Sequence, residues 1–117
     1  MNLYNKNNCF LLDISNTCNI NLDKISELNH SGDELKHMPK LHYYNNVITV
    51  YVGEVKHPMV PEHYIEYIIL ETSNGFQVKR LKPNAQPEES FTLIDDKLLN
   101  VYIYCNIHGL WKLNVEC

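Results

Sequence analysis

The sequence predicts a small all-β protein, an antiparallel β-sandwich, and three observations support this class. Short runs of β-branched, aromatic and aliphatic residues recur from residue 47 onward, turn-forming residues separate them, and only short segments could be helical. The length of 117 residues is that of about one domain. With 44% hydrophobic and 21% charged residues, the composition is globular rather than disordered.

Six segments have the strand pattern. They span residues 47–52, 64–71, 76–79, 91–94, 101–104 and 110–115. Gly53 closes the first segment, and Ser73-Asn74-Gly75 predicts a hairpin turn between the second and third. A loop at 82–87 and a turn at 95–97 separate the later segments.

Residues 1–33 are rich in Asn and have weak apolar periodicity, so we expect a small irregular N-terminal segment, with 29–33 as a linker. The sandwich then occupies 34–117. The start of the chain lacks the basic segment and long apolar core of a signal peptide. No apolar run approaches the ~20 residues of a membrane span. We therefore expect a cytoplasmic protein without a membrane partner.

The charge balance excludes one class of partner. Ten Lys and Arg residues face 14 Asp and Glu residues, which leaves a formal net charge of −4. An acidic chain is not expected to bind nucleic acid by general phosphate neutralisation. The four glycines form no phosphate-binding loop motif.

Six histidines and four cysteines are many for so small a chain. An even number of cysteines (Cys9, Cys18, Cys105 and Cys117) is compatible with two disulfides. In a cytoplasmic protein, however, disulfides are uncommon and thiols more often bind a metal or perform chemistry.

Three short stretches, 35–39, 57–63 and 105–109, concentrate the residues that bind transition metals. Each lies at the edge of a predicted strand, where a sandwich gathers its loops. The candidate ligands are His37, His57, His63, Cys105 and His108. An isolated His or a lone Cys-x-x-His is usually an ordinary residue, so the signal lies in the combination. Five donors exceed the four of a structural zinc site, and nitrogen and sulfur donors with one open position suit iron.

Two motifs make the signal specific. They are His57-Pro58-Met59 followed by His63, and Cys105-Asn106-Ile107-His108-Gly109-Leu110-Trp111. Together with Lys36-His37-Met38-Pro39, they closely resemble the superoxide reductases, the desulfoferrodoxin and neelaredoxin family. The spacings of 20, 6 and 3 residues from His37 to His57, His57 to His63 and Cys105 to His108 agree with that family. The resemblance covers about residues 35–113.

The resemblance implies an immunoglobulin-like β-sandwich with one mononuclear iron that alternates between Fe(II) and Fe(III). Residues His37, His57, His63 and His108 would be its equatorial imidazoles and Cys105 its axial thiolate. The implied reaction is the one-electron reduction of superoxide to hydrogen peroxide, with an external electron donor such as rubredoxin. A homo-oligomer, with a dimer favoured, is also implied.

A further residue enters through this resemblance. Lys36 would lie over the open iron position and attract superoxide, although a single lysine is more commonly just a solvated surface residue. Backbone N–H groups around Ile107 and His108 are expected to hydrogen-bond the sulfur of Cys105 and tune its metal.

The sequence departs from the family in two places. Leu35 precedes Lys36 where the family usually has Glu, and we expect the side chain of Glu34 to point elsewhere. The oxidised iron would then bind water or hydroxide. Residues 1–33 resemble a desulforedoxin domain that has lost its metal, because Cys9 and Cys18 are too few for a four-thiolate site in one chain. The alternative is a site completed by the same cysteines of a second subunit.

The remaining candidates have plainer interpretations. We interpret His30 and His42 as surface residues and Cys117 as an unattached thiol. Packing explains the aromatic residues better than an electron path does. They are Tyr64, Tyr67, Tyr102, Tyr104 and Trp111. Two other functions stay open: a non-catalytic iron-binding or electron-transfer domain that retained the ligands, and a plain sandwich that binds another protein.

Overall fold

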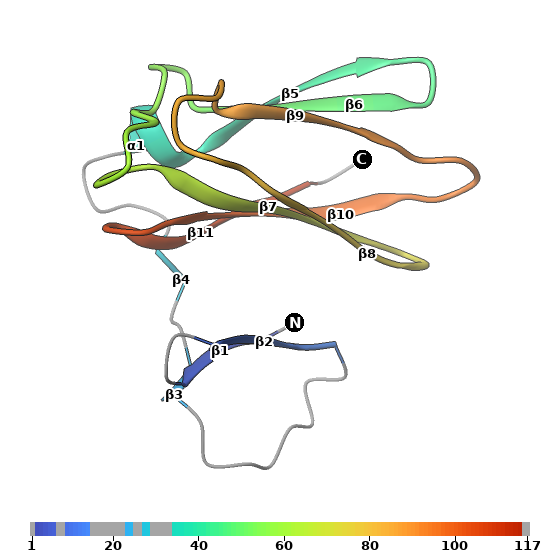
Figure 1. Cartoon of the computed structure of the whole chain (residues 1–117). Helices are drawn as coiled ribbons and strands as arrows, with labels where there is room; N and C mark the ends of the chain where they lie inside the picture. The colour runs from blue at the N-terminus through green and yellow to red at the C-terminus, as the bar shows by residue number, and fades with distance from the viewer. Residues whose placement is uncertain (1, 7–8, 15–22, 25–26, 29–33, 116–117) are drawn as a thin grey trace.

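The computed structural model describes residues 2–6, 9–14, 23–24, 27–28 and 34–115. These residues form strands and one single-turn helix (Figure 1). In chain order the elements are β1 (Asn2–Lys6), β2 (Cys9–Asp13), β3 (Asp23–Lys24), β4 (Glu27–Leu28), α1 (Glu34–His37), β5 (Pro39–Tyr44), β6 (Val47–Val52), β7 (Ile65–Thr72), β8 (Gly75–Arg80), β9 (Glu88–Thr92), β10 (Leu98–Cys105) and β11 (Gly109–Asn114).

Two sheets stack to form a sandwich, and a small third sheet lies beside it (Figure 1). The larger sheet has the strand order β4-β11-β10-β7-β8, and the sheet facing it has the order β5-β6-β9. Paired strands run antiparallel, except that the short β4 runs parallel to β11. This architecture confirms the predicted all-β class and the immunoglobulin-like antiparallel sandwich.

The main hydrophobic core lies between the two large sheets. Because successive side chains of a strand point to opposite faces, every second residue turns inward. Val50 of β6, Ile68 and Leu70 of β7, Ile103 of β10 and Trp111 of β11 are fully buried there. Removal of these side chains from water is the main stabilising contribution to the sandwich.

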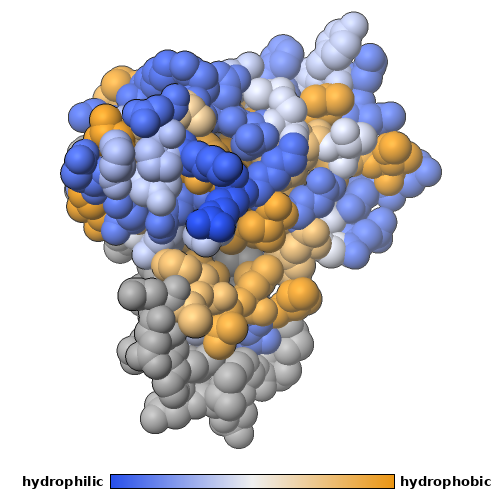
Figure 2. Space-filling view, viewed as in Figure 1, coloured by the Kyte–Doolittle hydropathy of each residue, from blue (hydrophilic) through white to orange (hydrophobic). Residues whose placement is uncertain are grey.

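The outer face of the five-stranded sheet is covered as well. Ile69 and Tyr102 are buried in a second cluster with Leu3 of the β1–β2 hairpin, and Phe10 of β2 packs against it. Figure 2 shows hydrophobic residues gathered where the hairpin meets the sandwich. With both faces buried, β7 contains a nearly continuous apolar run instead of a polar–apolar alternation.

The strands β6 to β11 overlap the six segments predicted from the sequence, and the predicted hairpin turn joins Thr72 to Gly75. The pattern did not indicate β5, because an edge strand with four exposed side chains alternates weakly. Strands β1 to β4 were not indicated either. Apolar residues of β1 and β2 contact another segment of the chain, and such contacts leave no local periodicity. The linker expected at 29–33 lies outside the described residues.

The strand directions bring several loops to one end of the sandwich. Strand β5 begins two residues after His37, β10 ends at Cys105, and the loop from Gly53 to Tyr64 connects β6 to β7 at the same end. The β5–β6 turn and the connection from β9 to β10 lie at the opposite end. Within the described ranges, no helix has the length and apolar character that a membrane crossing needs.

Candidate metal centre

Five side chains from three segments of the chain converge at one end of the sandwich. They are His37, His57, His63, Cys105 and His108, and their potential ligand atoms all lie within 4.8 Å of one another. The four imidazole rings follow one another in a closed circuit. Ring centroids lie 4.7 Å apart for His37–His57 and His57–His63, and 4.9 Å apart for His63–His108 and His108–His37. The structure thus brings together every candidate ligand that the spacing indicated.

His37 is the last residue of α1 and is buried. The carbonyl oxygen of Leu35 accepts a hydrogen bond of 2.7 Å from the backbone N–H of Val55, which ties the helix to the loop before His57. The ring of His37 stacks on the indole of Trp111, with centroids 4.6 Å apart and planes 8° from parallel. These contacts fix both the backbone and the ring plane of His37.

His57 is buried and its ring orientation is set by a short bond. Its Nδ1 lies 2.7 Å from the carbonyl oxygen of Pro58, so Nδ1 bears the proton and Nε2 has its lone pair available. Nε2 in turn lies 3.2 Å from Nε2 of His37. Burial lowers the pKa of His57 from 6.5 to about 4, the Pro58 bond opposes this, and the neighbouring imidazoles add to the lowering. His57 is therefore neutral at pH 7, the form that binds a metal.

Cys105 and His108 lie on one tight turn. Cys105 pairs with Gly109 across β10 and β11, which leaves a three-residue loop between them, and Gly109 adopts the left-handed φ of 84°. The backbone N–H of His108 donates to Sγ of Cys105 at 3.3 Å, which confirms the expected hydrogen bond to this sulfur. Nε1–H of Trp111 donates to the carbonyl oxygen of His108 at 3.1 Å.

His63 is half-buried and lies on the loop between His57 and β7. Its backbone exchanges two hydrogen bonds with Val60, at 3.0 and 3.1 Å, which close the loop into a small turn. The peptide groups on either side of His63 are held separately, by Asn106 on the turn that follows Cys105.

The two residues that precede His37 in the chain are exposed to solvent. Lys36 and Leu35 are both exposed on α1, so a lysine at the surface directly precedes His37 and a leucine occupies the position before it. The side chain of Glu34 lies outside the described residues.

The other predicted residues lie apart from the cluster or outside the description. Cys9 is a free, exposed thiol on β2, and His42 is exposed, as expected. His30, Cys18 and Cys117 fall outside the described residues. Packing of the aromatic residues is also confirmed: Trp111 and Tyr102 are buried in the two apolar clusters.

Two residues near the cluster were not assigned a role there from the sequence. Trp111 was expected only as a packing residue, yet it contacts the His37 ring and the His108 backbone. Gly53 was expected only to end a strand, yet it packs directly against the backbone of α1. A glycine and a tryptophan near strand ends are ordinary in sequence, and only the contacts reveal their position.

The donor set suits a transition metal. Imidazole nitrogens and a thiolate are the ligands that borderline and soft divalent ions prefer, and such sites are formed from neutral His and ionised Cys. Cys105 is buried, its sulfur accepts a backbone N–H, and four rings surround the same point. A β-sandwich with this cluster at its loop end is a protein that could hold one metal ion.

Comparisons with known proteins agree with this class. Residues 29–114 match the Desulfoferrodoxin family profile. The desulfoferrodoxin of Clostridium acetobutylicum is 41% identical over 80 residues, which cover 68% of this chain and 62% of that protein, so less than two thirds of its length is spanned. The superoxide reductase of Pyrococcus furiosus is 36% identical over 78% of this chain and 97% of its own.

A solved structure extends the likeness to nearly the whole fold. The crystal structure of the superoxide reductase from Treponema pallidum superposes with a TM-score of 0.82 and 30% identity, over 97% of this chain and 99% of that one. This chain belongs to the desulfoferrodoxin family.

Proposed function

We propose that this chain is a one-iron superoxide reductase. It would reduce superoxide to hydrogen peroxide by adding one electron and two protons to each superoxide. The observation that supports this most directly is the closed circuit of four imidazoles with one buried thiol beside it, in a chain of this family. A relative named superoxide reductase is 36% identical in sequence, and the solved superoxide reductase from Treponema pallidum has the same fold.

The five residues of the cluster would hold one iron ion, with His37, His57, His63 and His108 as the imidazole ligands and Cys105 as the thiolate. When bound, the iron would supply the electron by passing from the ferrous to the ferric state. The thiolate of Cys105 would donate electron density toward the metal. The N–H of His108, which donates to Sγ, would moderate this donation.

Lys36 would guide the substrate. The molecule has a formal net charge of −4, so attraction for an anion must be local. An exposed ammonium one residue from His37 provides such a local positive charge, and a water molecule hydrogen-bonded to it could deliver protons to the product. Leu35 stands where a carboxylate would be needed to bind the oxidised iron. We therefore propose that the oxidised iron would bind water or hydroxide instead.

The rest of the proposal concerns the whole protein. Residues 1–33 would be a desulforedoxin-like segment without a metal, and residues 34–117 the catalytic domain, so the chain would bind one iron. The enzyme would work in the cytoplasm, as a homo-oligomer with a dimer favoured, and a small electron-transfer protein such as rubredoxin would return it to the ferrous state.

The first experiment tests the thiolate. Iron-loaded wild-type protein is expected to develop a visible sulfur-to-iron charge-transfer band on oxidation, with about one iron per chain. Cys105→Ser removes the sulfur, so the band should disappear, whereas Cys9→Ser, which changes an exposed thiol on the N-terminal hairpin, should retain it. An intact band in Cys105→Ser, or two irons per wild-type chain, would contradict the proposed site.

The second experiment tests the reaction and Lys36. Superoxide generated in a pulse should oxidise the ferrous protein, and the second-order rate should fall about tenfold in Lys36→Ala, with a weaker dependence on salt. Lys97→Ala, at the opposite end of the sandwich, serves as the matched control and should react like wild type. Equal rates in the two variants would reject the role of Lys36, and a wild-type protein inert to superoxide would reject the enzyme.

A further inference from the structure

Asn106 connects the turn that bears Cys105 to the loop that bears His63. Its backbone N–H donates to the carbonyl oxygen of Tyr64 at 3.2 Å. Its side-chain Oδ1 accepts from the backbone N–H of Tyr64 at 2.9 Å, and its Nδ2 donates to the carbonyl oxygen of Glu62 at 3.0 Å. The two side-chain hydrogen bonds thus hold the peptide groups on both sides of His63, and the backbone bond holds the next peptide group along the chain.

These bonds hold the backbone of the His63 loop at residues that the pairing of β7 with β10 does not hold. His63 precedes β7, whose pairing with β10 starts only at Ile65 opposite Cys105. The backbone at Glu62 and Tyr64 is therefore not held by the ladder, and Asn106 continues the connection beyond the end of the sheet. Cys105, His108 and His63 become parts of one hydrogen-bonded unit.

The chemistry of this position is specific to asparagine. The side chain must present an acceptor to an N–H and a donor to a carbonyl at the same time, from a short stem. Aspartate has the same shape and the acceptor, but it lacks the donor and would place its carboxylate against the carbonyl oxygen of Glu62. Alanine loses both interactions, and glutamine is one methylene longer.

We propose that Asn106 is a positioning residue of the metal centre. It sets the position of His63 relative to Cys105 and His108, and so tunes metal affinity and the geometry of the site without binding the metal itself. The proposal rests on the proposed metal site for its consequence, but the clamp itself is a property of the metal-free chain. Second-layer hydrogen bonds of this kind typically affect metal affinity 10- to 100-fold.

The clamp is tested first without metal, by amide hydrogen exchange of residue 64. In metal-free Asn106→Ala the Tyr64 N–H should exchange at least about tenfold faster than in wild type, because its acceptor is gone. In Asn106→Asp the same amide should stay protected, because the acceptor oxygen remains. Equal exchange in wild type and Asn106→Ala would overturn the clamp whether or not the protein binds metal.

The consequence is tested by titration with Fe²⁺ under anaerobic conditions, followed by the fluorescence of Trp111, the chain's single tryptophan, which stacks on His37. Asn106→Ala and Asn106→Asp should both bind at least about tenfold more weakly and shift the charge-transfer band of the oxidised protein. Asn74→Ala, which removes a similar side-chain bond to Asp95 at the far end, is the control.

A double-mutant cycle with His63→Ala decides how Asn106 acts. If it acts through His63, then adding Asn106→Ala to His63→Ala changes Fe²⁺ affinity no further. An equal loss of affinity in both backgrounds would overturn the positioning role, and unchanged affinity in Asn106→Ala alone would do the same. Failure of the wild-type chain to bind Fe²⁺ would instead reject the proposed function, while the exchange measurement would still report on the clamp.

Discussion

Gly53 illustrates how a single position constrains the packing at the end of the sandwich where the candidate ligands lie. A Cβ atom added there would lie 2.8 Å from the carbonyl oxygen of Leu35, and 2.9 and 3.0 Å from the carbonyl carbon and oxygen of Lys36. These are backbone atoms, so they cannot turn aside as the end of a flexible side chain can. Glycine at this position lets the loop before His57 lie directly on the helix that ends at His37.

We expect Gly53→Ala to push α1 away from its loop. The free energy of unfolding should fall by about 1–3 kcal/mol, as for other overpacked positions, and Fe²⁺ affinity should fall with it because His37 moves. Denaturant titration and the Trp111 fluorescence measure the two effects. Lys56→Ala, an exposed change on the same loop, should cost much less in stability. If Gly53→Ala were as stable as wild type, α1 would be able to move aside without cost, which would contradict the prediction.

At the level of elements, the β1–β2 hairpin packs on the outer face of the larger sheet. Phe10 makes edge-to-face contacts with Tyr67 and Tyr104, with ring centroids 5.8 and 5.1 Å apart, and Leu3 is buried beside Ile69. Apolar contacts of this kind stabilise a protein without any metal. This packing explains how a segment with too few cysteines for its own site can still contribute to the fold.

Phe10→Ala should therefore reduce stability and leave the metal centre intact. We expect the free energy of unfolding to fall by about 2 kcal/mol, less than for a fully buried phenylalanine. The matched control is Leu11→Ala, because Leu11 is the next residue on β2 and is exposed. Denaturant titration of both variants, with iron content measured alongside, tests this. A loss in Leu11→Ala as large as in Phe10→Ala would contradict the packing of the hairpin.

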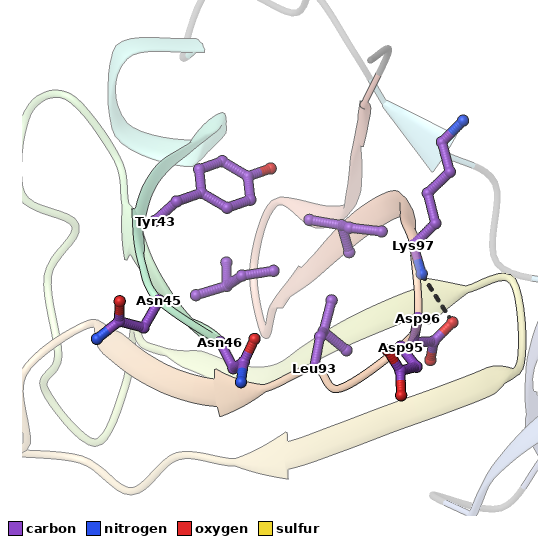
Figure 3. A pocket seen from close by; sticks show the side chains of 9 residues that line it. Tyr43, Asn45, Asn46, Leu93, Asp95, Asp96 and Lys97 are labelled. Carbon is purple, nitrogen blue, oxygen red and sulfur yellow. Dashed lines mark hydrogen bonds between the residues drawn. The ribbon is translucent and has the colours of Figure 1, made fainter.

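Over the whole molecule, the cluster of candidate ligands and a pocket with polar and apolar lining residues occupy opposite ends of the sandwich. The pocket, of about 340 Å³, lies between the β5–β6 turn and the connection from β9 to β10 (Figure 3). Asp96 joins two connecting segments at this end through four hydrogen bonds. Its carboxylate accepts bonds from the hydroxyls of Thr72 and Ser73, at 2.6 and 2.8 Å, and from the backbone N–H groups of Asn74 and Lys97, at 3.1 and 2.9 Å.

These bonds lower the pKa of Asp96 below its ordinary value of 3.8, and the Thr72 hydroxyl contributes most. A carboxyl group with a lowered pKa contributes stability above pH 3.8 and loses it as the pH falls through the lowered value. In metal-free protein, the stability difference between wild type and Asp96→Asn should be constant near neutral pH and shrink as the medium becomes more acidic than pH 3.8.

Denaturant titrations across this pH range measure the difference, and Asp95→Asn, at the exposed neighbouring residue, is the control. A difference between wild type and Asp96→Asn that stays constant with pH would show that the carboxylate is not bonded as described. Because the two ends are separated by the length of the strands, Fe²⁺ affinity at neutral pH should be the same in Asp96→Asn and wild type.

Much of this molecule follows from local sequence. The runs at 47–52 and 101–104 consist mainly of β-branched and aromatic residues, and such segments form strands in most contexts. The candidate ligands were also identifiable, because His and Cys residues that cluster near strand ends at these spacings seldom occur together unless they bind a metal. Strand β5 was not predicted because four of its side chains are exposed, and β1 and β2 were not predicted because their apolar residues are buried by a distant segment.

The sequence by itself determined the chemistry: which side chains could bind a metal, and that strands with turns between them would support these side chains. The tertiary structure alone decided how they are held. The stacking of Trp111 on His37, the approach of Gly53 to α1 and the bonds from Asn106 to both sides of His63 join segments far apart in the chain. Strand periodicity is a local property and can be seen in sequence, whereas these contacts exist only after the two sheets have packed and brought the loops together.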